Sequence, residues 1–141
     1  MNTLVVDASV VIKWVVEEEG TQHALVLRGA ARLIAPDLLV AECANILWKK
    51  VQRGELTREE ADLAAQLIER ADIELFPMRG LLHDATRIAI EISHPAYDCI
   101  YLALAMATNA RFVTADERLL QKLRFHADTR LTAAVVSLAE A

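Results

Sequence analysis

Short apolar runs rich in β-branched residues alternate along the chain with longer segments of helical periodicity. Runs of this kind predict buried strands, because both faces of a parallel sheet are covered by helices. The pattern predicts strands at residues 3–6, 32–35, 73–76, 111–114 and 135–138. It predicts helices at residues 8–18, 21–29, 37–53, 57–71, 81–92, 96–109 and 116–125. Residues 126–134, which run from His126 to Ala134, receive no assignment from the pattern.

Residues with strong turn and capping preferences support the predicted helix ends. Thr57 and Glu60 have the spacing of a capping box, in which the two side chains satisfy the first free backbone N–H groups of a helix. Gly20 is expected to end the first helix and Thr21 to cap the second. Pro95 is expected to set the start of the helix that follows it.

Strands that alternate with helices indicate βαβ units. We therefore predict an α/β fold, a three-layer sandwich with a short parallel sheet of about five strands flanked by helices. The 141 residues fit a single domain, residues 1–141, since domains commonly hold roughly 100–150 residues. Apolar residues make up 55% of the chain, which is too many for an intrinsically disordered protein.

The charge balance narrows the possible partners. The chain has 20 acidic and 15 basic residues and a net charge of −5, so binding of a polyanion through bulk charge is not expected. The chain has no apolar run of membrane-spanning length and no basic leader, so we expect no membrane partner and a cytoplasmic location. Cys43 and Cys99 are expected to be buried free thiols in a reducing compartment.

Four acidic residues occupy positions suited to a common site. Asp7 directly follows the first predicted strand, and Asp116 lies two residues beyond the fourth. Glu42 and Asp98 lie in the first turns of two predicted helices. In an open α/β sheet, ligands bind beyond the carboxyl ends of the strands, where the strand order reverses. These acids are therefore candidates for a shared site, although Asp98 and Asp116, taken singly, also suit an ordinary helix-capping role. Glu42 differs, because its neighbours are apolar or small.

Carboxylates that converge on one cleft repel one another, and a divalent cation relieves that repulsion. Mg²⁺ prefers oxygen ligands and fits such a group of acids. Zinc is disfavoured because the histidines show no ligand spacing with the cysteines. The histidines are expected to be ordinary surface or capping residues: His23, His83, His94 and His126.

Four stretches of the chain resemble the PIN-domain family, and within it the VapC-type toxins of toxin–antitoxin pairs. They are residues 5–9 (VVDAS), 36–42 (PDLLVAE) followed by Ala44 and Asn45, 97–105 (YDCIYLALA) and 113–116 (VTAD). Each stretch alone is a weak signal. All four, in order and on the expected elements, form a fairly specific one.

The resemblance implies a ribonuclease that depends on Mg²⁺ or Mn²⁺ and hydrolyses RNA phosphodiester bonds. Asp7, Glu42, Asp98 and Asp116 match the acidic quartet of the family. On this interpretation Asp7 and Asp98 are the principal metal ligands, Asp116 acts through water, and Glu42 binds a second ion or orients the attacking water. The family also implies a homodimer and a cognate antitoxin protein, whose C-terminal segment occupies a groove beside the site.

Smaller polar side chains accompany the acids. Ser9, Thr114 and Asn45 are expected to hold the carboxylates or a metal-bound water, although Ser9 and Thr114 equally suit simple hydrogen bonding at strand ends. A basic run lies on the same predicted helix as Glu42 and consists of Lys49, Lys50 and Arg53. It is a candidate for contact with the RNA backbone, or else a solvated helix end that complements the helix dipole.

Two other functions remain open at this point. Asp7 at the end of a strand also suits an aspartyl-phosphate phosphotransferase or phosphatase, but Ser9 stands where haloacid-dehalogenase-like enzymes carry a second Asp. A non-catalytic PIN-like module that only dimerises or binds a partner is the other alternative. Four mutually repelling acids are of no benefit to such a module.

Overall fold

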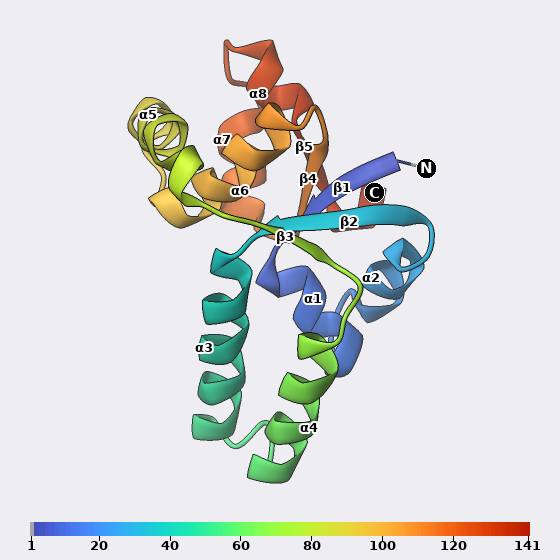
Figure 1. Ribbon diagram of the computed structural model, residues 1–141. Coiled ribbons are helices and arrows are strands. Elements are labelled where there is room, and N and C mark those ends of the chain that lie inside the picture. Colours follow the sequence, from blue (N-terminus) through green and yellow to red (C-terminus); the bar gives the residue numbers. More distant parts are fainter. Residues whose placement is uncertain (1) are drawn as a thin grey trace.

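A parallel sheet lies at the centre of the computed structural model, which describes residues 2–141 (Figure 1). The order of its five strands is β3-β2-β1-β4-β5, and every neighbouring pair is parallel. The strands are β1 (Asn2–Val6), β2 (Ala31–Pro36), β3 (Glu74–Phe76), β4 (Arg111–Thr114) and β5 (Val135–Ser137). The α/β fold with about five parallel strands, predicted from the alternation of apolar runs and helical segments, is confirmed.

Helices cover the sheet on both sides (Figure 1). One layer holds α1 (Ala8–Val15), α2 (Thr21–Leu27), α3 (Leu38–Gln52) and α4 (Arg58–Glu69). The other layer holds α5 (Leu82–Ile92), α6 (Ala96–Ala107), α7 (Glu117–Arg124) and α8 (Thr129–Ala133). Short 3₁₀ helices precede α5 and follow β5, at Arg79–Leu81 and Leu138–Glu140. Among residues 2–141 no helix combines the length and the apolar character that a membrane span needs.

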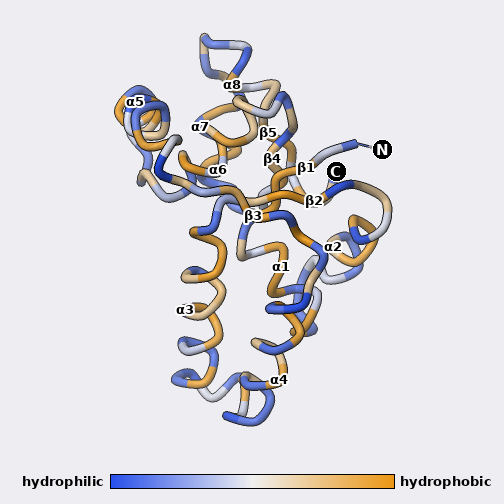
Figure 2. The backbone as a smooth tube through the Cα atoms, viewed as in Figure 1, coloured by the Kyte–Doolittle hydropathy of each residue, from blue (hydrophilic) through white to orange (hydrophobic). Residues whose placement is uncertain are grey.

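The core is densest around the two central strands. Val5, Val6, Phe112 and Val113 of β1 and β4 are fully buried, as expected for strands covered on both faces. Tyr101 of α6 is also fully buried, and its ring stacks on Phe112 with 5.5 Å between the centroids. Figure 2 shows hydrophilic residues gathered at the ends of α3 and α4 that lie farthest from the sheet. Cys43 and Cys99 are buried free thiols, as predicted.

Most predicted element boundaries lie within a few residues of the observed ones. The capping box is present, because Thr57 N–H donates to Glu60 Oε1 (2.8 Å) and Glu60 N–H donates to Thr57 Oγ1 (3.1 Å). The first predicted helix is too long, since α1 ends at Val15 and Val16 has an extended backbone. The Thr21 side chain holds the loop that follows: its hydroxyl donates to Val16 O and accepts from Glu18 N–H.

The structure corrects one local prediction, the cap of the second helix, and supplies a helix in the segment that had no assignment. Thr21 was expected to cap the second helix, but Gly20 occupies that position, with a left-handed φ of 89° that favours glycine. The segment without an assignment contains α8, capped by the Asp128 side chain, which accepts from Arg130 N–H. His126 stabilises the segment just before α8, because its Nδ1 accepts a hydrogen bond from Asp128 N–H at 3.0 Å. This short helix is stabilised by local polar contacts at its N-terminus. The stretch has no apolar periodicity from which the helix could have been predicted.

The strand order reverses between β1 and β4. Chain segments after β1 lead to β2 and β3 on one side, whereas β4 leads to β5 on the other. The carboxyl ends of β1 and β4 are adjacent, as their register pairs Val6 with Val113. Asp7 follows β1 and Asp116 follows β4, so the fold places both acids at the position where open α/β sheets bind their ligands.

Candidate metal and nuclease site

Asp7 is a buried carboxylate held by three hydrogen bonds. It caps α1, and its Oδ1 accepts from Ser9 Oγ–H (2.6 Å) and from Val10 N–H (3.2 Å). Its Oδ2 accepts from Thr114 Oγ–H at 3.3 Å, which connects the ends of β1 and β4. Ser9 and Thr114 thus both donate hydrogen bonds to the Asp7 carboxylate.

The surroundings of Asp7 oppose its negative charge. Burial raises the pKa of Asp7 to about 6, although the hydrogen bonds from Ser9, Val10 and Thr114 act in the opposite direction. The neighbouring charge of Asp98 raises the pKa further. A cation close to Asp7 would stabilise its charged form, since an opposite charge within ~4–6 Å favours ionisation.

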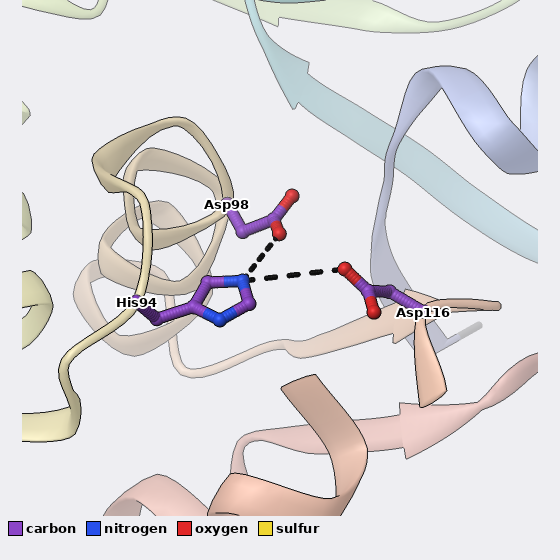
Figure 3. A group of neighbouring side chains, drawn as sticks. All are labelled: His94, Asp98 and Asp116. Carbon is purple, nitrogen blue, oxygen red and sulfur yellow. Dashed lines mark hydrogen bonds and ion pairs between the residues drawn. The ribbon is translucent and has the colours of Figure 1, made fainter. Parts of the chain in front are cut away.

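Asp98 and Asp116 converge on His94 in the second helical layer (Figure 3). Asp98 lies in the first turn of α6, and its Oδ2 is 2.7 Å from His94 Nε2. Asp116 caps α7 through its Oδ1, and its Oδ2 is 4.0 Å from the same His94 nitrogen. One potential ligand atom from each of these three residues lies within 4.8 Å of the others.

Glu42 reaches the site from α3. The Tyr101 hydroxyl donates a hydrogen bond of 2.5 Å to Glu42 Oε1. Burial raises the pKa of Glu42, the Tyr101 hydrogen bond opposes this, and the charge of Asp98 raises the pKa again. Glu42 is thus close enough to Asp98 for the two carboxylates to repel each other.

Asp98 is the common neighbour of the other three acids. Its own pKa is raised, first by burial and then by the Asp116 carboxyl group, while the hydrogen bond from His94 lowers it. Asp98 in turn raises the pKa values of Asp7 and Glu42. Asp98 is therefore linked by charge repulsion to each of the other three predicted acids. Their oxygens are hard donors, which suit Mg²⁺ or Mn²⁺ better than a soft metal, so the residues present fit a divalent cation.

His94 was wrongly predicted to be an ordinary surface or capping histidine. It is 8% exposed and contacts Asp98 and Asp116. The available signal was its position directly before Pro95 and four residues before Asp98, a spacing that brings two side chains together around a helix N-terminus. The other histidines behave as expected, with His23 and His83 exposed and His126 in a local cap.

The remaining candidates on α3 lie farther along the helix. Asn45 is exposed and forms no side-chain hydrogen bond with any residue in 2–141. Lys50 donates to Glu18 Oε2 (3.0 Å), and Lys13 donates to Glu18 Oε1 (3.1 Å). Lys50 therefore connects α3 to the loop after α1, whereas Lys49 and Arg53 are exposed to solvent.

Comparison with known proteins assigns the family. The sequence profile described as "PIN domain" matches residues 4–125, a span that contains all four acids. The chain belongs to the PIN-domain family. Its curated relatives include Ribonuclease VapC3 of Pyrobaculum aerophilum, which is 34% identical over 122 residues that cover 84% of this chain and 93% of the relative.

Further relatives of this PIN-domain protein carry similar names. The VapC ribonuclease Mb0985 of Mycobacterium bovis is 35% identical over 116 residues, covering 82% of this chain and 87% of the relative. Ribonuclease VapC9 of Mycobacterium tuberculosis matches to the same extent. The crystal structure of PAE2754 from Pyrobaculum aerophilum superposes with a TM-score of 0.68 at 22% identity, covering 98% of this chain and 90% of that one. This last likeness supports the fold.

Proposed function

We propose that this PIN-domain protein is a ribonuclease that uses Mg²⁺ or Mn²⁺ to hydrolyse RNA phosphodiester bonds. The observation that carries the proposal is the placement of acids where β1 and β4 end. The Thr114 hydroxyl joins the buried Asp7 to the end of β4, and Asp98 and Asp116 lie together at His94. The charge of Asp98 also acts on Asp7 and on Glu42. The names of its relatives, which are ribonucleases at 34–35% identity, point to RNA as the substrate.

Each acid has a distinct role in this proposal. Asp7 and Asp98 would be the principal residues that hold the cation, Asp116 would contact it through water, and Glu42 would orient the attacking water or hold a second ion. When bound, the cation supplies stabilisation of the negative charge that develops on the phosphate and lowers the pKa of bound water. The chain itself supplies the alignment. Ser9 and Thr114 fix the Asp7 carboxylate, and Tyr101 fixes Glu42.

Lys49 and Arg53 are the basic residues that we propose for contact with the RNA backbone. Both are exposed on α3, the helix that also carries Glu42. Lys50 is a weaker candidate because Glu18 already binds its ammonium group. The acidic net charge of the protein limits such contacts to a local patch.

The names of the relatives lead us to propose that the protein is the toxin of a type II toxin–antitoxin system in the cytoplasm. An apolar groove between α3 and α4 is lined by residues that include Leu39, Cys43, Leu47, Ile68 and Leu75. We assign this groove to an apolar segment of the antitoxin. We also propose a homodimer through α5, where Leu82 and Ile90 are 68% and 76% exposed on one helix face.

A cleavage assay tests the proposed activity. The purified protein should cleave single-stranded RNA with Mg²⁺ or Mn²⁺, and excess EDTA should abolish cleavage. Asp7→Asn should lose cleavage, whereas Asp72→Asn, which changes an exposed acid in the turn before β3, should keep it. Cleavage that persists in EDTA would refute the metal-dependent mechanism. Covalent phosphate on Asp7 would favour a phosphotransferase, and an inert protein that still binds its partner would favour a non-catalytic module.

A further inference from the structure

His94 has a hydrogen-bond partner on each of its two ring nitrogens. Its Nε2 lies 2.7 Å from Asp98 Oδ2, and its Nδ1 lies 3.2 Å from Lys122 Nζ. Lys122 comes from α7, and its Nζ also donates to the Ser93 carbonyl oxygen at 2.5 Å. Two segments that are 28 positions apart in sequence, the start of α6 and α7, therefore meet at one imidazole ring, which is almost completely buried.

The two partners determine which nitrogen carries the hydrogen. A lysine ammonium group can only donate hydrogen bonds, and a carboxylate can only accept them. Nδ1 must therefore accept from Lys122, and Nε2 must carry the hydrogen that is donated to Asp98. The contacts form a chain with one direction, from Lys122 through His94 to Asp98.

Asp98 is an acid that a hydrogen-bond donor stabilises. Burial and the neighbouring Asp116 carboxyl group raise its pKa, and the hydrogen bond from His94 opposes them. The backbone around His94 is also restrained. Ser93 ends α5 with a left-handed φ of 52°, and Pro95 precedes the first residue of α6. The Lys122 ammonium group donates a hydrogen bond to the Ser93 carbonyl oxygen.

We propose that His94 and Lys122 are positioning residues of the metal site. In this proposal, which rests on the proposed function, His94 orients Asp98 as an Nε2–H donor, and Lys122 fixes that tautomer. His94 is not itself a ligand, although its Nε2 lies close to Asp98 and Asp116. To bind a cation, Nε2 would have to lose its hydrogen to Nδ1, which would then oppose the ammonium group of Lys122.

Nuclear magnetic resonance of the imidazole nitrogens tests this assignment directly. In the metal-free protein, long-range ¹H–¹⁵N spectra should show His94 as the Nε2–H tautomer, and the pattern should persist at saturating Mg²⁺. An Nδ1–H tautomer in the metal-free protein would overturn the proposal. A change to Nδ1–H on adding Mg²⁺ would also overturn it, because it would identify His94 as a ligand. Lys122→Met should increase the Nδ1–H population, since it removes the donor at Nδ1.

Calorimetric titration with Mn²⁺ provides a second measurement. His94→Ala should weaken Mn²⁺ binding by about 10–100-fold, the usual effect of removing a group that orients a metal ligand. His94→Gln, which offers an amide donor in place of the ring N–H, should recover much of this loss. His83→Gln is the matched control, because His83 is an exposed histidine on α5. Unchanged Mn²⁺ affinity in His94→Ala would contradict the positioning role.

The two measurements also separate this inference from the proposed function. If the wild-type protein bound neither Mg²⁺ nor Mn²⁺, the proposed function would fail, but the metal-free spectrum would still report the tautomer. If metal bound and RNA were cleaved while the His94 tautomer was Nδ1–H, only the positioning role would fail. A folding defect in His94→Ala would leave the wild-type and Lys122→Met spectra as the decisive tests.

Discussion

The hydroxyl of Tyr101 donates a hydrogen bond to Glu42 across 59 positions of sequence and so connects α6 to α3. The same ring stacks on Phe112 of β4 and is completely buried. One side chain therefore joins both helical layers to the sheet. Its polar end holds an acid of the site, and its apolar body packs in the core.

Replacement of Tyr101 separates these two contributions. Tyr101→Phe keeps the stacked ring but leaves Glu42 without its donor, so the free energy of unfolding should fall by about 1.5–3 kcal/mol, the usual contribution of a hydrogen bond to a charged group. Urea titration at pH 7 measures this change. If the hydrogen bond is the cause, Tyr101→Phe should have little further effect in a Glu42→Ala background. Equal effects in both backgrounds would show that packing is responsible.

The raised pKa of Asp7 predicts that the metal-free protein is less stable when this residue is ionised. The group has a pKa of about 6 in the folded protein against 3.8 in the reference state, so ionisation favours unfolding. The destabilisation is absent below about pH 4 and grows between about pH 4 and pH 6. At higher pH it stays constant at about 3 kcal/mol. In EDTA, Asp7→Asn should therefore exceed the wild type in unfolding free energy by up to this amount at pH 8.

Urea titrations of Asp7→Asn and wild type from pH 4 to pH 8 measure this difference. The gain should shrink toward zero as the pH falls to about 4. Asp72→Asn, a change at an exposed acid, should show no such trend. A constant difference between Asp7→Asn and wild type over the whole pH range would contradict the prediction.

The lysines at the end of α3 should differ in their effects. Lys50 is partly buried and bound to Glu18, whose pKa is held below its usual value by Lys50 and Lys13 against the opposing effect of burial. Lys50→Met should lower the free energy of unfolding by roughly 0.5–1 kcal/mol, and Lys49→Met should leave it nearly unchanged. Lys49→Met should instead weaken RNA binding at low salt, measured by fluorescence anisotropy. RNA affinity unchanged in Lys49→Met would remove this residue from the proposed contact.

The exposed apolar face of α5 should control self-association. Leu82→Glu and Ile90→Glu each place a charge where the proposed homodimer would bury a methyl-rich side chain, so both should shift the protein to the monomer. Light scattering coupled to size-exclusion chromatography measures the mass. Leu63→Glu, at a 57% exposed leucine of α4, is the control that should leave the mass unchanged. A monomeric wild-type protein would refute the homodimer.

The pattern of apolar and polar residues predicted much of this architecture, because most strands contain a short apolar run and several helix ends, such as that at Thr57, have a strong local signal. The end of α1 and the whole of α8 lacked such a signal. The positions of Asp7 and Asp116 in the site could be predicted from the same pattern, because the sequence shows directly which residues follow a predicted strand. The spacing of His94 four residues before Asp98 was visible in the sequence and was missed, whereas its contact with Lys122, 28 positions away on α7, has no sequence signal. The engagement of Lys50 by Glu18 is likewise a tertiary contact without a periodic signal.

The division of the four acids between the two helical layers has a mechanical consequence. Asp7 and Glu42 belong to the layer of α1–α4, and Asp98 and Asp116 to the layer of α5–α8. An ion bound by all four acids would link the two helical layers across the end of the sheet. Metal binding should then slow amide hydrogen exchange in both layers together.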